Sequence, residues 1–117
     1  MVNKLKKTDM GTLRINNDVI ASIAKNAALQ VDGVVGVRTN TWTTISDFLR
    51  KGYHHKGVTL DISENDVKID ISIIVKFGVM IPEAANLAQE NIRTSIEEMT
   101  GLTVSEVNIN IADIQSE

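Results

Sequence analysis

Two parts of the sequence carry hydrophobic residues at the three- and four-residue spacing of an amphipathic helix. The first is residues 18–31, where Asn16, Asn17 and Asp18 offer N-cap chemistry and Gly33 favours a left-handed cap. The second starts near Pro82 and Glu83 and ends at Gly101. Their predicted buried stripes are Ile20, Ile23, Ala24, Ala27, Ala28 and Val31 in the first helix, and Ala85, Ala88, Ile92, Ile96 and Met99 in the second.

Alternation of apolar and polar residues predicts strands over residues 12–15, 34–37, 58–62, 67–77 and 102–111. The third and fourth strands form a hairpin with a four-residue loop. Its favoured register places Ile62 opposite Val67, because the alternative sets two aspartates opposite each other. The alternation shifts by one at Ser105, which predicts a bulge in the last strand.

The predicted order is strand, helix, strand, short helix, strand, strand, helix, strand. Two helices with single apolar stripes both need a sheet face to cover. We therefore expect an α+β fold: a two-layer sandwich, with a mixed β-sheet and the two main helices packed on one face. Residues 1–9 are expected to form a flexible basic tail, and residues 10–117 a single domain.

The short helix is the segment that the predicted core does not require. Within residues 40–53, an apolar stripe is followed by two basic residues. Such a short helix needs another surface to bury its apolar side. One interpretation is packing on its own domain, and the other is docking on a partner, a sister subunit or a membrane surface. The candidate partner-binding residues are Trp42, Ile45, Phe48, Leu49, Arg50 and Lys51.

Charge is divided unevenly along the chain, whose formal net charge is −3. Residues 1–56 hold nine Lys and Arg against four Asp and Glu, a net charge of +5. Residues 57–117 hold three against eleven, a net charge of −8. The split fits head-to-tail self-association, or a basic edge that meets an anionic partner. A solvated surface is the alternative.

No residue pattern predicts catalysis, and we expect no catalytic, cofactor-binding or metal-binding residues. The chain has no Cys, and its only two histidines, His54 and His55, are adjacent and would point apart. Neither a nucleophile elbow nor a phosphate-binding glycine loop occurs. The predicted sheet face offers no exposed aromatic residue for base stacking and the domain is acidic overall, so nucleic acid is not an expected partner. No run of about 20 apolar residues predicts a membrane span.

Two stretches, residues 11–37 and 67–111, are similar to the alkaline shock protein family of Gram-positive bacteria, also described as envelope stress response proteins. The similarity covers essentially the whole domain. It implies a cytoplasmic, non-enzymatic protein of cell-envelope homeostasis without a cofactor. Some relatives are held at the membrane by a partner with its own anchor, so the expected partners are such a protein or a second copy. The signature residues, expected to be structural, are Gly33, Pro82, Glu83, Gln89, Thr100, Gly101 and Asn108.

One departure from the family concerns length. Stress-abundant members carry long charged extensions that this chain lacks, so it looks closer to a short housekeeping branch. Genes of that branch tend to sit beside a gene for a fatty-acid (dihydroxyacetone-kinase-like) kinase. The resemblance therefore keeps an alternative function open, that of a regulatory partner of such a kinase. A third, weaker alternative is an enzyme whose site follows no recognised pattern.

Overall fold

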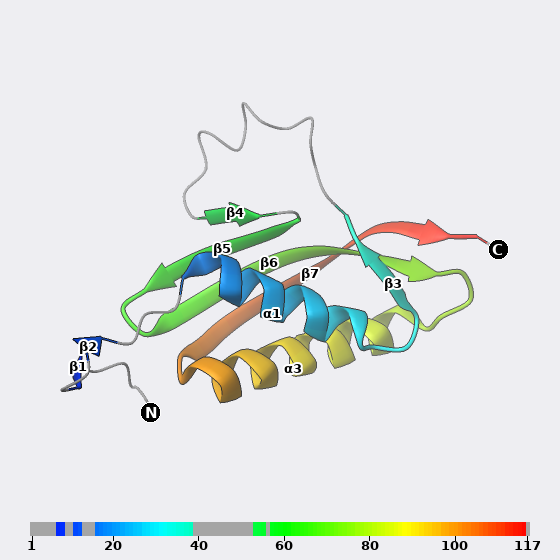
Figure 1. The fold of residues 1–117 in the computed structure, drawn as a ribbon. Coiled ribbons are helices and arrows are strands. Elements are labelled where there is room, and N and C mark those ends of the chain that lie inside the picture. Colours follow the sequence, from blue (N-terminus) through cyan, green and yellow to red (C-terminus); the bar gives the residue numbers. More distant parts are fainter. Residues whose placement is uncertain (1–6, 9–10, 13–15, 39–52, 56, 117) are drawn as a thin grey trace.

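A computed structural model describes residues 7–8, 11–12, 16–38, 53–55 and 57–116 of the chain. Two α-helices and seven β-strands lie in this part (Figure 1). In chain order they are β1 (Lys7–Thr8), β2 (Gly11–Thr12), α1 (Asn17–Leu29), β3 (Val34–Val37), β4 (Tyr53–His55), β5 (Val58–Ser63), β6 (Asp66–Lys76), α3 (Ile81–Thr100) and β7 (Thr103–Gln115). The predicted short helix lies outside the described residues.

The five-stranded sheet is built around β6, its central strand. On one side of β6, both β5 and β3 pair antiparallel to it, and β4 pairs with the outer edge of β5. Ser72 marks the point where β3 and β5 meet, because its carbonyl accepts from the Arg38 N–H and its N–H donates to the Gly57 carbonyl. On the other side, β7 runs parallel to β6. The sheet is therefore mixed, as the sequence predicts.

Both helices cover one face of this sheet, which makes the two-layer α+β sandwich (Figure 1). The inward side chains of β6 are buried, and the alternate ones point to the uncovered face. Small residues on α1 allow it to approach its neighbours closely, since Ala21, Ala24 and Ala28 are 0% exposed. The buried side chains on β6 are Val67, Ile69, Ile71, Ile73 and Val75.

Three local predictions are confirmed. The β5–β6 hairpin pairs Ile62 with Val67. The ladder between β6 and β7 shifts after Val104, which places an extra residue at Ser105. Gly101 caps α3 in the left-handed conformation, with φ 77°. The hairpin turn is tighter than the predicted four-residue loop, because Ser63 and Asp66 already pair and Glu64 adopts a positive φ.

Several predicted boundaries are wrong. α1 ends at Leu29, and its cap is Gln30 in the right-handed region, so Gly33 is not the cap. Gly33 does have φ 94°, but it lies in the turn before β3, where a Cβ would meet the Val79 side chain. Two other predictions are not tested. β1 lies within the predicted tail and pairs with β2, but most of residues 1–9 lie outside the described residues. Of the strand predicted over residues 12–15, only Thr12 is described, so that strand stays a prediction.

The buried stripe of α3 is also shifted by one residue at both ends. Ala84 is buried in place of Ala85, and Thr100 in place of Met99, whose side chain is 70% exposed. Thr100 can be buried because its hydroxyl is satisfied on both counts: it donates to the Ile96 carbonyl at 2.7 Å and accepts from the Leu102 N–H at 3.1 Å.

Candidate functional site

The predicted docking residues, Trp42, Ile45, Phe48, Leu49, Arg50 and Lys51, lie outside the described residues. The chain on either side of them is described, and it meets at one point of the sheet. Gly57 approaches Arg38 so closely that a Cβ on it would come 2.0 Å from the Arg38 carbonyl oxygen. With φ 87° as well, position 57 requires glycine. Arg38 and Gly57 thus lie in contact, although they are far apart in the sequence.

Two side chains of α3 bind the backbone of β7. Gln89 Nε2 donates to the Val107 carbonyl at 3.0 Å, and Glu97 Oε2 accepts from the Val104 N–H at 2.9 Å. Val104 and Val107 would otherwise present unpaired groups at the outer edge of the sheet. The sequence predicts a structural role for Gln89 but not this contact, because nothing in the pattern of α3 shows which strand it lies beside.

The other signature residues lie at element ends or on the surface. Pro82 and Glu83 are exposed in the first turn of α3, where the ring suits the helical φ and the carboxylate suits the positive end of the helix. Asn108 is exposed on β7, and its Nδ2 donates to Glu106 Oε2 at 2.7 Å. The structure does not bring Gly33, Pro82 and Asn108 together with Gln89 and Thr100 into one site.

A groove runs between α1 and α3 on the side away from the sheet, and we call it the α1–α3 groove. Large apolar side chains remain exposed along it: Met99 is 70%, Leu87 55% and Val19 46% exposed. These residues lie in two open hollows of the groove. One is lined by Val19, Ser22, Ile23, Asn26, Ala27, Gln30, Ser95 and Met99. The other is lined by Gln30, Val31, Asp32, Leu87, Glu90, Asn91 and Thr94.

Amide side chains cross the middle of the α1–α3 groove. Asn91 Nδ2 donates to the carbonyl of Ala27 at 2.8 Å and lies 3.5 Å from Gln30 Oε1. They tie the two helices together between the two hollows. Exposed apolar side chains in a groove between two helices are typical of surfaces that bind a protein segment. Sequence reasoning missed this site, since Met99 is placed in the core by its helical spacing and Leu87 and Val19 fall off the predicted stripes.

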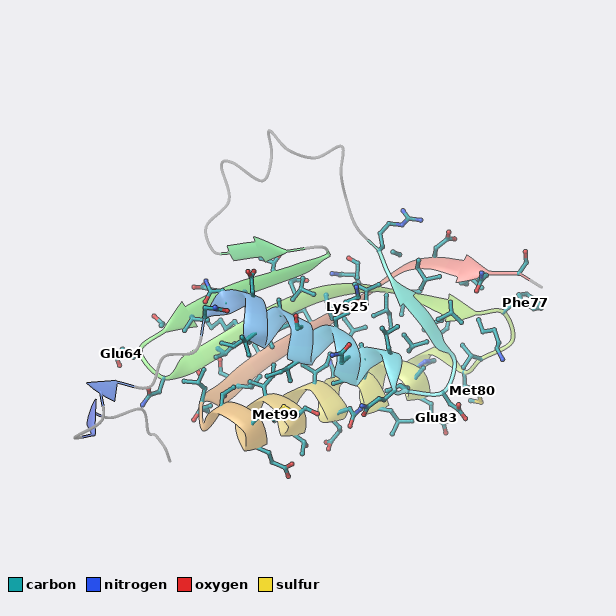
Figure 2. The ribbon with its side chains drawn as sticks, in the orientation of Figure 1. Lys25, Glu64, Phe77, Met80, Glu83 and Met99 are labelled. Atoms are coloured by element: carbon teal, nitrogen blue, oxygen red, sulfur yellow. The ribbon has the colours of Figure 1, made fainter. Side chains whose placement is uncertain are left out.

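A second group of exposed apolar residues lies at one end of the molecule. Phe77, in the turn after β6, is 69% exposed, and Met80, at the N-cap of α3, is 66% exposed. Figure 2 shows both at the end of the sheet opposite to Glu64, with Met99 near the other end of α3. Phe77 and Met80 are therefore separated from Met99 by the length of the helix.

The uncovered face of the sheet is polar. Asp61 faces Lys68 across the hairpin, and Asp70 Oδ1 accepts from Asn110 Nδ2 at 2.8 Å. Within the described residues, no group of three or more His, Asp or Glu side chains is placed to hold a metal ion. Neither helix in the described part of the chain combines the length and the apolar character that crossing a membrane requires.

The fold and the groove define a small α+β sandwich with an open helical face, and comparison with known proteins gives its family. The chain belongs to the alkaline shock protein 23 family, which has a cell envelope-related function and whose family model matches residues 5–116. This confirms the family resemblance seen in the sequence.

Its relatives include two uncharacterised proteins of Bacillus subtilis. YqhY is 42% identical over 108 residues, which are 92% of this chain and 80% of YqhY. YloU is 31% identical, over 93% of this chain and 92% of YloU. A Streptococcus pyogenes protein named as a stress response regulator gls24 homolog is 26% identical over 91% of this chain, which spans 60% of that longer protein.

Solved structures with a related fold include the CTD of MamM. One variant of it matches with a TM-score of 0.55 and 13% identity, over 88% of this chain and 85% of the MamM chain. At this identity the likeness concerns the fold alone.

Proposed function

We propose that this protein is a protein-binding module of cell-envelope homeostasis that is not itself an enzyme. It assembles with a second copy or with a related membrane-anchored protein. The observation that carries the proposal is the α1–α3 groove, in which Met99, Leu87 and Val19 stay largely exposed. Exposed apolar residues gathered along one surface favour a protein partner that covers them.

The shape and chemistry of the groove fit a helical segment of a partner. Side chains from both helices flank the groove, among them the exposed Met99, Leu87 and Val19. Asn91 and Gln30 supply polar groups at its centre. An amphipathic helix binds such a surface through its apolar stripe. The spacing of Trp42, Ile45 and Phe48 supports a second contact, because it gives the short helix predicted within residues 40–53 an apolar side of its own.

The proposed location follows from the same partner. We place the protein in the cytoplasm, where it reaches the membrane only through the anchored protein that it binds. The gls24 homologue is named a stress response regulator, and that name supports a role for this chain in the response to envelope stress.

Membrane vesicles test the proposal. The purified protein is mixed with native vesicles of Bacillus subtilis, with the same vesicles stripped by protease, and with liposomes made from the extracted lipids. Trp42 is the only Trp, so its emission reports on its surroundings. We expect cosedimentation with native vesicles alone. Binding to bare liposomes would show a lipid-binding protein instead, and a protein that binds no vesicle and stays monomeric at all concentrations would contradict the proposal.

Matched variants assign the binding to a surface. Met99→Ser and Leu87→Ser change the α1–α3 groove, and Trp42→Ala changes the predicted docking segment. Phe77→Ser is the control, because Phe77 is equally exposed but lies at the end of the molecule. We expect the groove variants to weaken binding to native vesicles at least tenfold and the control to leave it unchanged. Equal loss in all of them would exclude the groove as the specific contact.

A further inference from the structure

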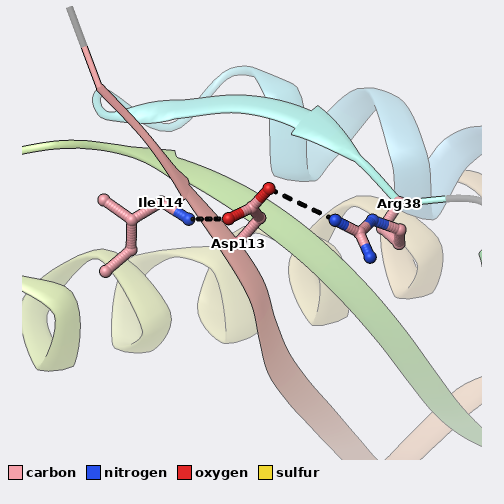
Figure 3. Close-up of polar contacts among 3 residues, drawn as sticks. All are labelled: Arg38, Asp113 and Ile114. Carbon is pink, nitrogen blue, oxygen red and sulfur yellow. Dashed lines mark hydrogen bonds and ion pairs between the residues drawn. The ribbon is translucent and has the colours of Figure 1, made fainter.

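The strand β7 forms one edge of the sheet, and side chains cover both ends of that edge. Among the described strands, β7 pairs with β6 alone, along one of its two edges. Near its start, Glu97 and Gln89 bind the Val104 N–H and the Val107 carbonyl. Near its end, Asp113 Oδ1 accepts from the N–H of Ile114 at 2.8 Å (Figure 3). Covering of this kind prevents a bare edge from pairing at random.

Between these covered ends lies a short open stretch. The Val107 carbonyl points away from β6, since it is bound by Gln89. Residues alternate along a strand, so Ile109 and Ile111 also direct their N–H and C=O groups to the outer edge. No described side chain or backbone group binds them there. Two N–H donors and two carbonyl acceptors are thus available, spaced by one residue, on a stretch without charge. We call residues 109–111 the edge window.

We propose that the edge window binds the same window of a second copy, antiparallel, so that two sheets join into one. Ile109 of each copy lies opposite Ile111 of the other, and Asn110 lies on the two-fold axis. Two residues whose backbone groups face each other across an antiparallel pair exchange both hydrogen bonds. The four open groups of each window are then all satisfied. A closed two-fold contact uses the same surface on both copies, and this window is its own complement.

Side chains on both faces of the joined sheet agree with this register. The ladder to β6 shifts between Ile111 and Asp113. Asp113 therefore takes the regular position that follows Ile111. If the pairing continues, Val107 of one copy lies opposite Ile114 of the other on the helix side of the sheet. Ile114 is 46% exposed in the single copy. On the polar side Asn108 lies opposite Asp113.

Acidic side chains across the joined edge face neutral amides. Each acidic side chain of β7 beyond the window faces an amide of the other copy: Asp113 faces Asn108, and Glu106 faces Gln115. No two carboxylates lie opposite each other. Asp113 is in addition paired with Arg38 at 3.2 Å, so its charge is already balanced (Figure 3). Opposed like charges would destabilise such a pair, and this register avoids them.

A second strand has room to reach the window. In Figure 1 the final part of β7, coloured red, lies well apart from α3, whereas its first part runs along the helix. Near Val104 and Val107 the helix reaches the edge through the Glu97 and Gln89 side chains, and the final part of β7 lies clear of the helix. Few residues are buried by such a contact, so we expect a weak dimer that forms as the concentration rises.

A single cysteine tests the register directly, since the chain contains none. Asn110 is exposed and would face its own copy at a Cα separation of about 4.5 Å, within the range that a disulfide spans. We expect Asn110→Cys to give a covalent dimer on mild oxidation. Asn108→Cys is the matched control, because the two copies of residue 108 would be separated by about 13 Å at the rise of a strand. Equal cross-linking of both variants, or of neither, would overturn the proposal.

A proline tests the hydrogen bonds. The N–H of Ile111 points to the edge, so Ile111→Pro removes a bond of the dimer and none of the ladder to β6. Sedimentation is expected to show at least tenfold weaker association for Ile111→Pro than for the control Ile111→Val. Independently of any variant, hydrogen exchange at Ile109 and Ile111 should slow as the concentration of the unmodified protein rises. Exchange that is independent of concentration in a dimer would place the contact elsewhere.

This inference rests on the self-association part of the proposed function, and the two fail in different ways. A concentration-dependent dimer in which Asn110→Cys does not cross-link overturns the edge window and leaves self-association standing. Sedimentation as a monomer at every concentration overturns both the window and self-association, and leaves only the membrane-anchored partner, which the vesicle experiment tests.

Discussion

The two flanks of α3 carry different kinds of side chain. On the flank toward β7, Gln89 and Glu97 use polar side chains to bind strand backbone. On the flank toward α1, Leu87 and Met99 expose large apolar side chains along a groove. The flank toward β7 supplies hydrogen-bond partners for backbone groups at the edge of the sheet. The flank toward α1 leaves apolar surface that the fold does not bury. We therefore assign stability to the first flank and binding to the second.

The largest loss of stability is expected for the residues of α3 that lie between the two flanks and face the sheet. Ile92 is 0% exposed, so Ile92→Ala removes buried contacts and leaves a cavity. We expect the free energy of unfolding in urea to fall by about 2–5 kcal/mol. Leu87→Ala, on the same helix but 55% exposed, is the control and should cost less than about 1 kcal/mol. Similar losses for both would mean that Leu87 is buried in solution.

A smaller loss is expected where α3 turns into β7. Thr100→Val keeps the shape but removes the hydroxyl that bonds Ile96 and Leu102, and the Leu102 N–H then lacks its partner. We expect destabilisation by about 1–3 kcal/mol. Thr94 is exposed on the same helix, so Thr94→Val should be close to neutral in the same urea titration. A neutral Thr100→Val would show that the bond at the C-terminus of α3 contributes nothing.

The next largest loss of stability is expected on the flank of α3 toward β7. Glu97→Ala removes the acceptor for the Val104 N–H, which lies at a partly buried edge where water can replace it in part. A loss of about 1 kcal/mol is expected, together with faster hydrogen exchange at Val104. Glu98→Ala is the control, since Glu98 is the exposed neighbour with the same charge. Unchanged exchange at Val104 would contradict the role given to this flank.

The difference between the flanks also explains what the sequence could predict. Register and bulge follow from a two-residue period and from charge pairing, so Ile62 opposite Val67 and the extra residue at Ser105 are confirmed. The buried stripe of a helix is wider, so the sequence pattern defines its edges less exactly. Ala84 and Ala85, like Met99 and Thr100, are neighbours that differ by about 100° around the helix axis. Hydrophobicity alone favours burial of Met99, whereas the bonded hydroxyl of Thr100 makes it the residue that fits inside.

Contacts between elements that are distant in the chain could not be predicted from the sequence. The role of Gln89 depends on the position of Val107, eighteen residues further along the chain. The candidate groove depends on how α1 lies beside α3, which no local pattern specifies. The predicted docking segment around Trp42 remains a prediction, because its residues lie outside the described part of the chain.

The smallest effect on stability, and the clearest on function, is expected on the α1 flank. Met99→Ser replaces a side chain that is 70% exposed, so the free energy of unfolding should change by less than about 0.5 kcal/mol. Binding to native vesicles should nevertheless weaken at least tenfold, because the partner loses an apolar anchor. A stable variant with unchanged vesicle binding would remove the groove from the binding surface. A large loss of stability would instead mean that Met99 packs against its own domain, and would make the two flanks of α3 alike.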